Sequence, residues 1–257
     1  MKNIVTLTIF ELKKYWTIAR IIVFGAIFAV ISIVSLVPKF INLPLESVEL
    51  NFGSIIQGSL AFFIPVLVLF FTGAIVAGDV RSFYLRTILA RPILKYEYLA
   101  SKYFFALINL LVGSVFFAII PAIFMGLFYE SPMKFDFFIS LLTYILYIAE
   151  GSLFISISIW ISTLLRGYTN IFILAIWIFL EASLINGVMN SFVSYNVGLA
   201  IFADFFFPGG FSEASKLIES GGILFYESLM WGLAALAFFV ALSFYQITKI
   251  KIDVNSD

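Results

Sequence analysis

The sequence contains no cysteine and no histidine, and only 12% of its 257 residues are charged. Without cysteine, disulfides and thiol chemistry are excluded. Without histidine, the common zinc sites and the Ser-His-Asp and Cys-His nucleophilic systems are excluded as well. No G-x-x-x-x-G-K-[ST] phosphate-binding loop occurs. These absences argue against an enzyme, and we expect no catalytic residue, metal site or cofactor on this chain.

Basic and acidic residues are equal in number, so the formal net charge is zero. A nucleic-acid-binding surface needs a basic excess, and nucleic acid is therefore not an expected partner. Apolar residues, by contrast, make up 63% of the chain, and the mean hydropathy is +1.11. A soluble domain is about 45–50% apolar and about 25% charged. The composition thus predicts an integral membrane protein in contact with the lipid bilayer.

Long apolar runs alternate with short polar segments along the whole chain. A helix needs roughly 20 apolar residues to cross a hydrocarbon core of ~30 Å. We therefore expect an all-α integral membrane fold, with residues 1–257 forming a single transmembrane domain. The six expected spans are residues 21–37, 55–77, 103–129, 137–165, 171–188 and 229–247.

Residues 1–20 have the composition of an amphipathic helix lying in the headgroup layer, with aromatic and basic residues together. We assign its polar face to Lys2, Glu11, Lys13, Lys14 and Arg20. With this helix on the cytoplasmic side, twelve lysines and arginines lie inside and three lie outside. The positive-inside rule then predicts that both termini are cytoplasmic.

Residues 78–102 form the longest charged interruption between two apolar runs. Val80, Leu85 and Ile88 recur at helical spacing, and Pro92 prevents that helix from continuing unbroken. The residue before a proline avoids the helical region, so Arg91 is the expected corner. We expect a short helix along the membrane face, a proline turn, and a second helix that starts near Tyr96 and enters the bilayer.

This segment resembles the cytoplasmic coupling loop of ABC-2-type transporter permeases, the transmembrane subunits of ABC transporters. The family pattern runs from an acidic residue through Gly-Thr-Leu, Leu-Leu, Pro and a basic residue to Gly-Lys. The matching positions here are Gly78-Asp79, Leu85, Ile88-Leu89, Pro92, Lys95 and Lys102. The chain departs from the pattern with Phe83-Tyr84 for Gly-Thr, Asp79 for glutamate and Ser101 for glycine.

The resemblance implies a permease subunit of an ATP-driven exporter, in the plasma membrane of a prokaryote. Its implied partners are two ABC ATPase subunits, which would carry ATP and Mg²⁺, and a second permease copy forming a homodimer through spans one and five. The residues expected to dock on the ATPase and couple to it are Asp79, Arg81, Leu85, Arg86, Arg91, Pro92, Lys95 and Lys102. The alternative interpretation is that the basic residues only set topology and contact lipid headgroups.

Residues 189–227 form a long, semi-apolar outer segment containing Phe205-Phe206-Phe207. The resemblance implies an outer gate or lid between the last two spans. The segment is equally compatible with a packing loop anchored by its phenylalanines.

Two acidic residues, Glu150 and Glu181, lie inside predicted spans, where no lysine or arginine neutralises them. A carboxylate facing lipid is costly, so both are expected to face the protein interior. Glu150, Phe154, Ser158 and Ser162 recur every four residues and mark a polar helix face. The candidates for the translocation pathway, or alternatively for hydrogen bonds that join helices, are Glu150, Glu181, Ser158 and Ser162.

Two other classes of function remain open. One is an ion channel or ion-coupled carrier that uses Glu150 and Glu181 without an ATPase. The other is a membrane assembly protein without any transport pathway.

Overall fold

The computed structural model describes residues 2–18, 21–22, 24–26, 29–30, 52–72, 75–76, 79, 93–128, 136–164, 172–173, 175–176, 211, 214–215, 217–218 and 223–249. These residues form helices and turns, with no strand among them. Five long helices account for most of them: α1 (Lys2–Tyr15), α3 (Phe52–Thr72), α6 (Lys95–Phe128), α7 (Phe137–Leu164) and α12 (Ile223–Lys249). The expected all-α class is therefore confirmed for the described part of the chain.

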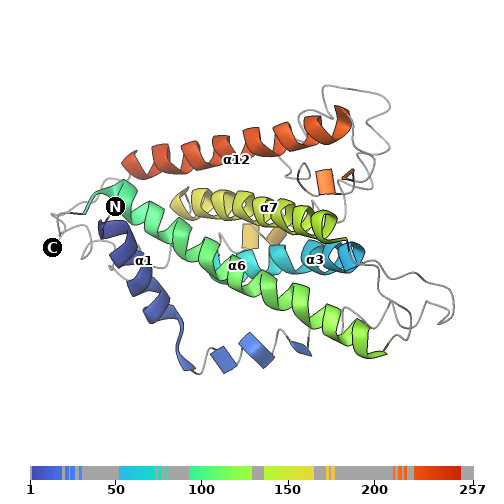
Figure 1. Ribbon diagram of the computed structural model, residues 1–257. Helices are drawn as coiled ribbons and strands as arrows, with labels where there is room; N and C mark the ends of the chain where they lie inside the picture. The colour runs from blue at the N-terminus through green and yellow to red at the C-terminus, as the bar shows by residue number, and fades with distance from the viewer. Residues whose placement is uncertain are drawn as a thin grey trace.

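The core of the bundle is formed by α3, α6 and α7 (Figure 1). Phe63 of α3 stacks on Phe117 of α6 with ring centroids 3.8 Å apart. Two glycines allow close packing, because a Cβ on Gly113 would lie 2.8 Å from Leu67 and one on Gly151 would lie 2.5 Å from Leu110. Small residues at such contacts are typical of helix packing in membranes.

The fifth helix, α12, lies along α7, and α1 packs against the first turns of α6 (Figure 1). The hydroxyl of Ser243 in α12 donates a hydrogen bond of 3.1 Å to the carbonyl of Ser156 in α7. Lys95, at the start of α6, donates to the carbonyl of Thr248, near the end of α12, at 3.4 Å. The contact between Lys95 and Thr248 lies at the same end of the bundle as α1 (Figure 1). We call this end the α1 end.

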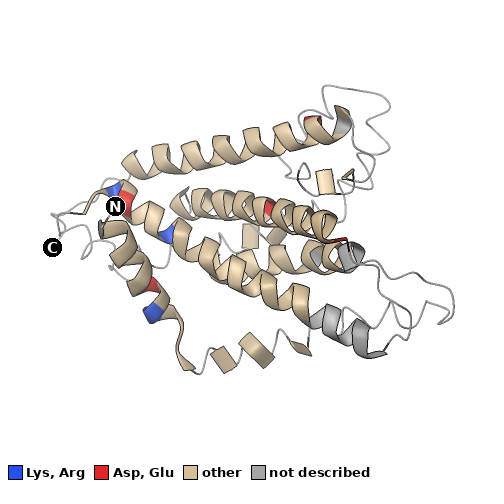
Figure 2. Cartoon of the chain, in the orientation of Figure 1, with Lys and Arg blue, Asp and Glu red and all other residues tan. Residues whose placement is uncertain are grey.

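The helices run in defined directions relative to the α1 end. The backbone N–H of Val76, just after α3, donates to Ser162, near the end of α7, at 3.2 Å. Hence α3, α7 and α12 all finish at the α1 end, whereas α6 starts there (Figure 1). Figure 2 shows lysine positions of α1 and α6, in blue, towards this same end.

Three stretches of the described residues are long and apolar enough to cross a membrane: Lys95–Ile119, Phe137–Leu164 and Phe225–Lys249. The helix α3 contains no charged residue and has Pro65 in its interior. Large apolar side chains remain exposed along α6 and α12, including Phe116, Ile119 and Met230. These features indicate a membrane-embedded protein.

Helix boundaries agree with the expected spans in part. The helix α7 matches the expected span 137–165 within one residue. By contrast, α3 ends at Thr72 rather than residue 77, because Ile75 and Val76 form a turn although they are apolar. The end of the segment 78–102 and span three share one continuous helix, α6, and α12 begins at Ile223 inside the expected outer segment. Most of residues 21–37, 171–188 and 189–222 lies outside the described residues.

Candidate functional site

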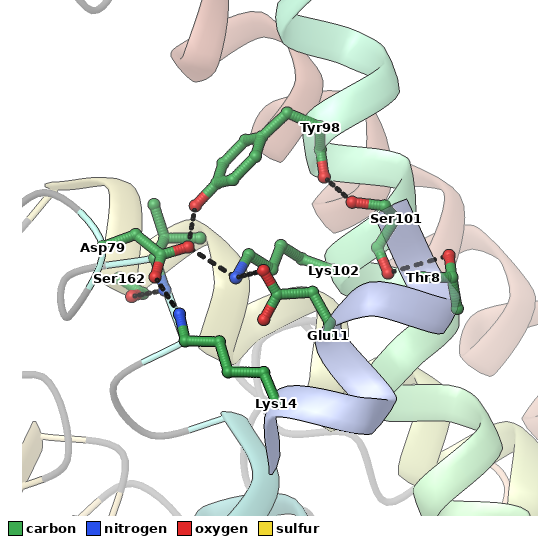
Figure 3. Close-up of polar contacts among 9 residues, drawn as sticks. Thr8, Glu11, Lys14, Asp79, Tyr98, Ser101, Lys102 and Ser162 are labelled. Atoms are coloured by element: carbon green, nitrogen blue, oxygen red, sulfur yellow. Dashed lines mark hydrogen bonds and ion pairs between the residues drawn. The ribbon is translucent and has the colours of Figure 1, made fainter. Parts of the chain in front are cut away.

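A lysine lies buried two turns into α6, at the α1 end of the bundle. The side chain of Lys102 is only 2% exposed. Its ammonium contacts Asp79 Oδ2 at 2.5 Å and Glu11 Oε1 at 2.8 Å (Figure 3). The two carboxylates come from α1 and from the chain just beyond α3. One cation thus joins three separate parts of the chain.

Two further groups complete this arrangement. The hydroxyl of Tyr98 donates a hydrogen bond of 2.8 Å to Asp79 Oδ2. The ammonium of Lys14 lies 3.6 Å from Asp79 Oδ1 (Figure 3). We call Glu11, Lys14, Asp79, Tyr98 and Lys102 the charge cluster. It contains two cations and two carboxylates, and this balance lets charged groups lie inside the bundle, where an unpaired charge would be costly.

The spacing along each helix explains how these side chains meet. Tyr98 and Lys102 are four residues apart on α6, and Glu11 and Lys14 are three apart on α1, so each pair shares one helix face. The first turn of α6 is held by Glu97, whose Oε2 accepts a hydrogen bond from the Leu94 N–H at 3.2 Å. A glutamate at the third helical position commonly reaches back in this way.

A ladder of polar contacts aligns α1 with α6. Asn3 Nδ2 donates to Glu97 Oε2 at 3.0 Å, and Thr8 Oγ1 donates to the Ser101 carbonyl at 3.4 Å. The Glu11 to Lys102 ion pair follows, and then Trp16 Nε1 donates to Asn109 Oδ1. The residue numbers of the contacting pairs increase along both helices. The two helices therefore lie side by side and run in the same direction.

Aromatic rings surround the end of α1. Tyr15 has edge-to-face contacts with Trp16, Phe71 and Phe105, at centroid distances of 5.8, 5.7 and 5.4 Å. Phe24 stacks on Phe71 at 5.7 Å and meets Phe70 edge-on at 5.3 Å. Aromatic residues commonly gather at the boundary between a bilayer and water. The charge cluster is thus bordered by apolar rings on one side.

A pocket of about 250 Å³ lies between the charge cluster and these rings. Its lining residues are Glu11, Lys14, Tyr15, Phe70, Phe71, Ile75, Asp79, Lys102 and Phe105. The pocket therefore has one charged wall and one apolar wall.

The polar face of α7 lies in the core of the bundle. Thr72 Oγ1 donates to Ser158 Oγ at 2.6 Å, and Ser162 Oγ accepts from the Val76 N–H at 3.2 Å. Both serines therefore hold α7 against the end of α3. Glu150, which is 7% exposed, also faces the interior. This placement agrees with the expectation that Glu150 avoids lipid, while a pathway role for it stays a prediction.

The residues expected to couple to an ATPase are placed unequally. Asp79 and Lys102 are buried in the charge cluster, and Lys95 binds the end of α12. The remaining predicted site residues, Arg81, Leu85, Arg86, Arg91, Pro92 and Glu181, lie outside the described residues.

Glu11, which we assigned to the polar face of the first helix, is directed at α6. Glu11 is buried against Lys102, whereas Val5, Ile9 and Phe10 on the same helix are exposed. The physical reason is that a buried cation on α6 faces this side of α1. Periodicity could group Glu11 with Lys14, but it could not identify their partners.

Comparison with protein-family models and with curated proteins finds no match for this chain.

Proposed function

We propose that this chain is the transmembrane permease subunit of an ATP-driven exporter, driven by an ATPase on a separate chain. The observation that carries the proposal is the contact between Asp79 and Lys102, the two ends of the segment that resembles a coupling loop. Their 2.5 Å ion pair holds the two ends of that segment together. Glu11 of α1 forms a second ion pair with the same lysine.

The directions of the helices support six membrane passages. The first helix, α1, lies at the α1 end, yet α3 must start at the opposite end because it finishes beside the end of α7. Likewise α7 and α12 both finish at the α1 end. The chain must therefore return from the α1 end to the opposite end between α1 and α3, and again between α7 and α12. We propose that each return is a single membrane passage, which together with the four helices gives six and leaves α1 and the end of α12 on the same side.

The charge cluster is suited to transmitting a movement of residues 80–92 to the helices of the bundle. A partner that moves residues 80–92 would act on Asp79 and on the first turns of α6 together, because these points are bonded to each other. The movement would then enter α3, α6 and α1 as one unit. Buried ion pairs suit this role, since breaking one leaves an uncompensated charge in the interior.

Under this proposal the protein works with partners. Two ATPase subunits bind ATP and Mg²⁺, and a second permease copy completes the pathway. The complex lies in the plasma membrane of a prokaryote, with the α1 end facing the cytoplasm. The gathering of lysines at that end supports this orientation, since cytoplasmic segments carry an excess of lysine and arginine.

The burial of Glu150 in the helical core favours a second candidate, an ion-coupled carrier that uses Glu150 and Glu181. The two functions differ in one respect that can be measured. A carrier of this kind needs no ATPase, whereas the proposed permease does.

The test is to purify the tagged chain in mild detergent from its native host and identify any bound ABC ATPase. We expect an ATPase to copurify with the wild type, and the double reversal R86E/R91E to lose it while remaining inserted. The matched control is K249E/K251E, which reverses the same amount of charge at the end of α12 and beyond. Equal ATPase retention by both double variants would contradict coupling through residues 80–92.

A further inference from the structure

The pocket beside the charge cluster combines groups that one kind of ligand would use together. Lys14 lies on its lining with a side chain that is 47% exposed. Glu11 contacts Lys102 through Oε1, and Figure 3 shows its other carboxylate oxygen directed away from that lysine. The pocket thus presents a cation and a carboxylate oxygen to the same ligand.

The charge balance of the pocket decides between ligand classes. Its wall holds Glu11, Asp79, Lys14 and Lys102, which is two charges of each sign. A purely anionic or purely cationic ligand would meet repulsion from half of these groups. A zwitterion can place its phosphate near Lys14 and its ammonium near Glu11. The charges therefore favour a zwitterionic ligand.

The size and the opposite wall indicate a lipid. The pocket volume of about 250 Å³ is large enough for a small polar headgroup such as phosphoethanolamine. The second wall is formed by Tyr15, Phe70, Phe71 and Phe105. Phe70 is 46% exposed, so the apolar wall continues to the outer surface of the bundle, where acyl chains would lie.

We propose that this pocket binds the headgroup of a phosphoethanolamine phospholipid from the adjacent leaflet. The phosphate lies at Lys14, the ammonium donates to Glu11, and the acyl chains leave past Phe70. The bound lipid fills the space between α1 and the end of α3 and holds α1 in its register on α6. The proposal needs only a membrane protein, so it stands or falls separately from coupling to an ATPase.

The test measures lipid retention by native mass spectrometry. The full-length protein is delipidated in detergent and exposed to equal amounts of dioleoyl phosphatidylethanolamine, phosphatidylcholine and phosphatidylglycerol. We expect one phosphatidylethanolamine to be retained per chain, about tenfold in preference to either other lipid, since one charged hydrogen bond gives roughly that ratio. Preferential retention of phosphatidylglycerol, or no retention, would overturn the proposal.

Variants separate this pocket from general attraction to the membrane. K14Q should lose the preference, whereas K13Q, which changes the exposed neighbouring lysine on the same helix, should keep it. Equal loss in both variants would contradict a specific site. F70A provides a second test that leaves the charge cluster intact, and it should also weaken retention. Unchanged retention by F70A would overturn the assigned acyl path.

A competition assay separates a lipid from a soluble ligand of the same chemistry. Glycerophosphoethanolamine carries the same headgroup without acyl chains, and it should fail to displace the bound lipid. Displacement of about half of the lipid or more at equal concentration would show that the apolar wall contributes nothing. That outcome would overturn the assignment to a phospholipid.

Discussion

Lys102 is the residue on which the α1 end of the bundle depends most. It makes ion pairs with Glu11 and Asp79 and lies 5.4 Å from the centroid of the Tyr98 ring. Taking charges out of water costs several kcal/mol per ion, and the mutual attraction of the cluster offsets that cost only while every member is present. The cluster therefore specifies how α1, α3 and α6 meet, more than it adds net stability.

Replacing Lys102 with glutamine should remove the buried cation that Glu11 and Asp79 share. We expect K102Q to lower the free energy of unfolding by about 3–5 kcal/mol, which is typical when one partner of a buried pair is removed. The measurement is the unfolding transition in detergent, followed by circular dichroism. The control K13Q removes the same charge from an exposed position and should stay within about 0.5 kcal/mol.

A triple variant tests the reason for that loss. E11Q/D79N/K102Q removes all three charges at once and should recover part of the lost stability, because no carboxylate remains uncompensated. If the triple variant were as unstable as K102Q, lost packing rather than stranded charge would be the cause.

Part of the charge cluster could be predicted from the sequence, and part could not. The resemblance marked Asp79 and Lys102 as members of one segment, but it assigned both to contact with a partner. Helical periodicity placed Glu11 and Lys14 on one face of α1. It cannot say whether that face meets water or the charges of another helix, because Glu11 and Lys102 are 91 positions apart.

The length and hydropathy of the apolar runs predicted that a helix is present better than they predicted the residues at which it begins and ends. The helix α7 was predicted almost in full, since a bilayer requires a long uninterrupted apolar stretch. The end of α3 was placed too late because Val76 is fully buried without being helical. The apolar character of a residue indicates that it is buried, not that it is helical. Burial continues beyond the last turn of α3.

The close packing of α3, α6 and α7 depends on glycine at two positions. A Cβ on Gly151 would lie 2.5 Å from Leu110 and 3.0 Å from Ile64, and one on Gly113 would lie 2.8 Å from Leu67. We expect Gly151→Ala and Gly113→Ala each to destabilise the protein by about 1–3 kcal/mol, since the crowded side chains must move. The change would be measured as a shift of the unfolding transition in detergent.

Gly25→Ala is the control for these two variants. A Cβ at Gly25 meets nothing within 4 Å, so the substitution should not destabilise the protein, and the higher helix propensity of alanine could stabilise it by up to about 1 kcal/mol. A stabilising shift at all three positions would indicate that helix propensity, rather than close packing, governs the effect.

In the whole molecule, neighbouring helices that run in the same direction are the informative feature. The pairs α3 with α7 and α7 with α12 are parallel and in contact. Helices that follow one another closely in the sequence are expected to be antiparallel, as α6 and α7 are. The sequence could predict the number of apolar runs, but not which of them lie side by side, because all are apolar on most faces.

These directions make a prediction about sidedness that the chain is well suited to test, since it contains no native cysteine. Single cysteines at positions 13 and 249 lie at the α1 end, whereas position 136, directly before α7, lies at the opposite end. With the α1 end in the cytoplasm, a membrane-impermeant maleimide applied to intact cells should label D136C and leave K13C and K249C unlabelled. In inverted vesicles the pattern should reverse, because lysine-rich ends remain on the cytoplasmic side. Labelling of K13C and K249C from opposite sides would require an odd number of passages, and the six-passage arrangement would then be wrong.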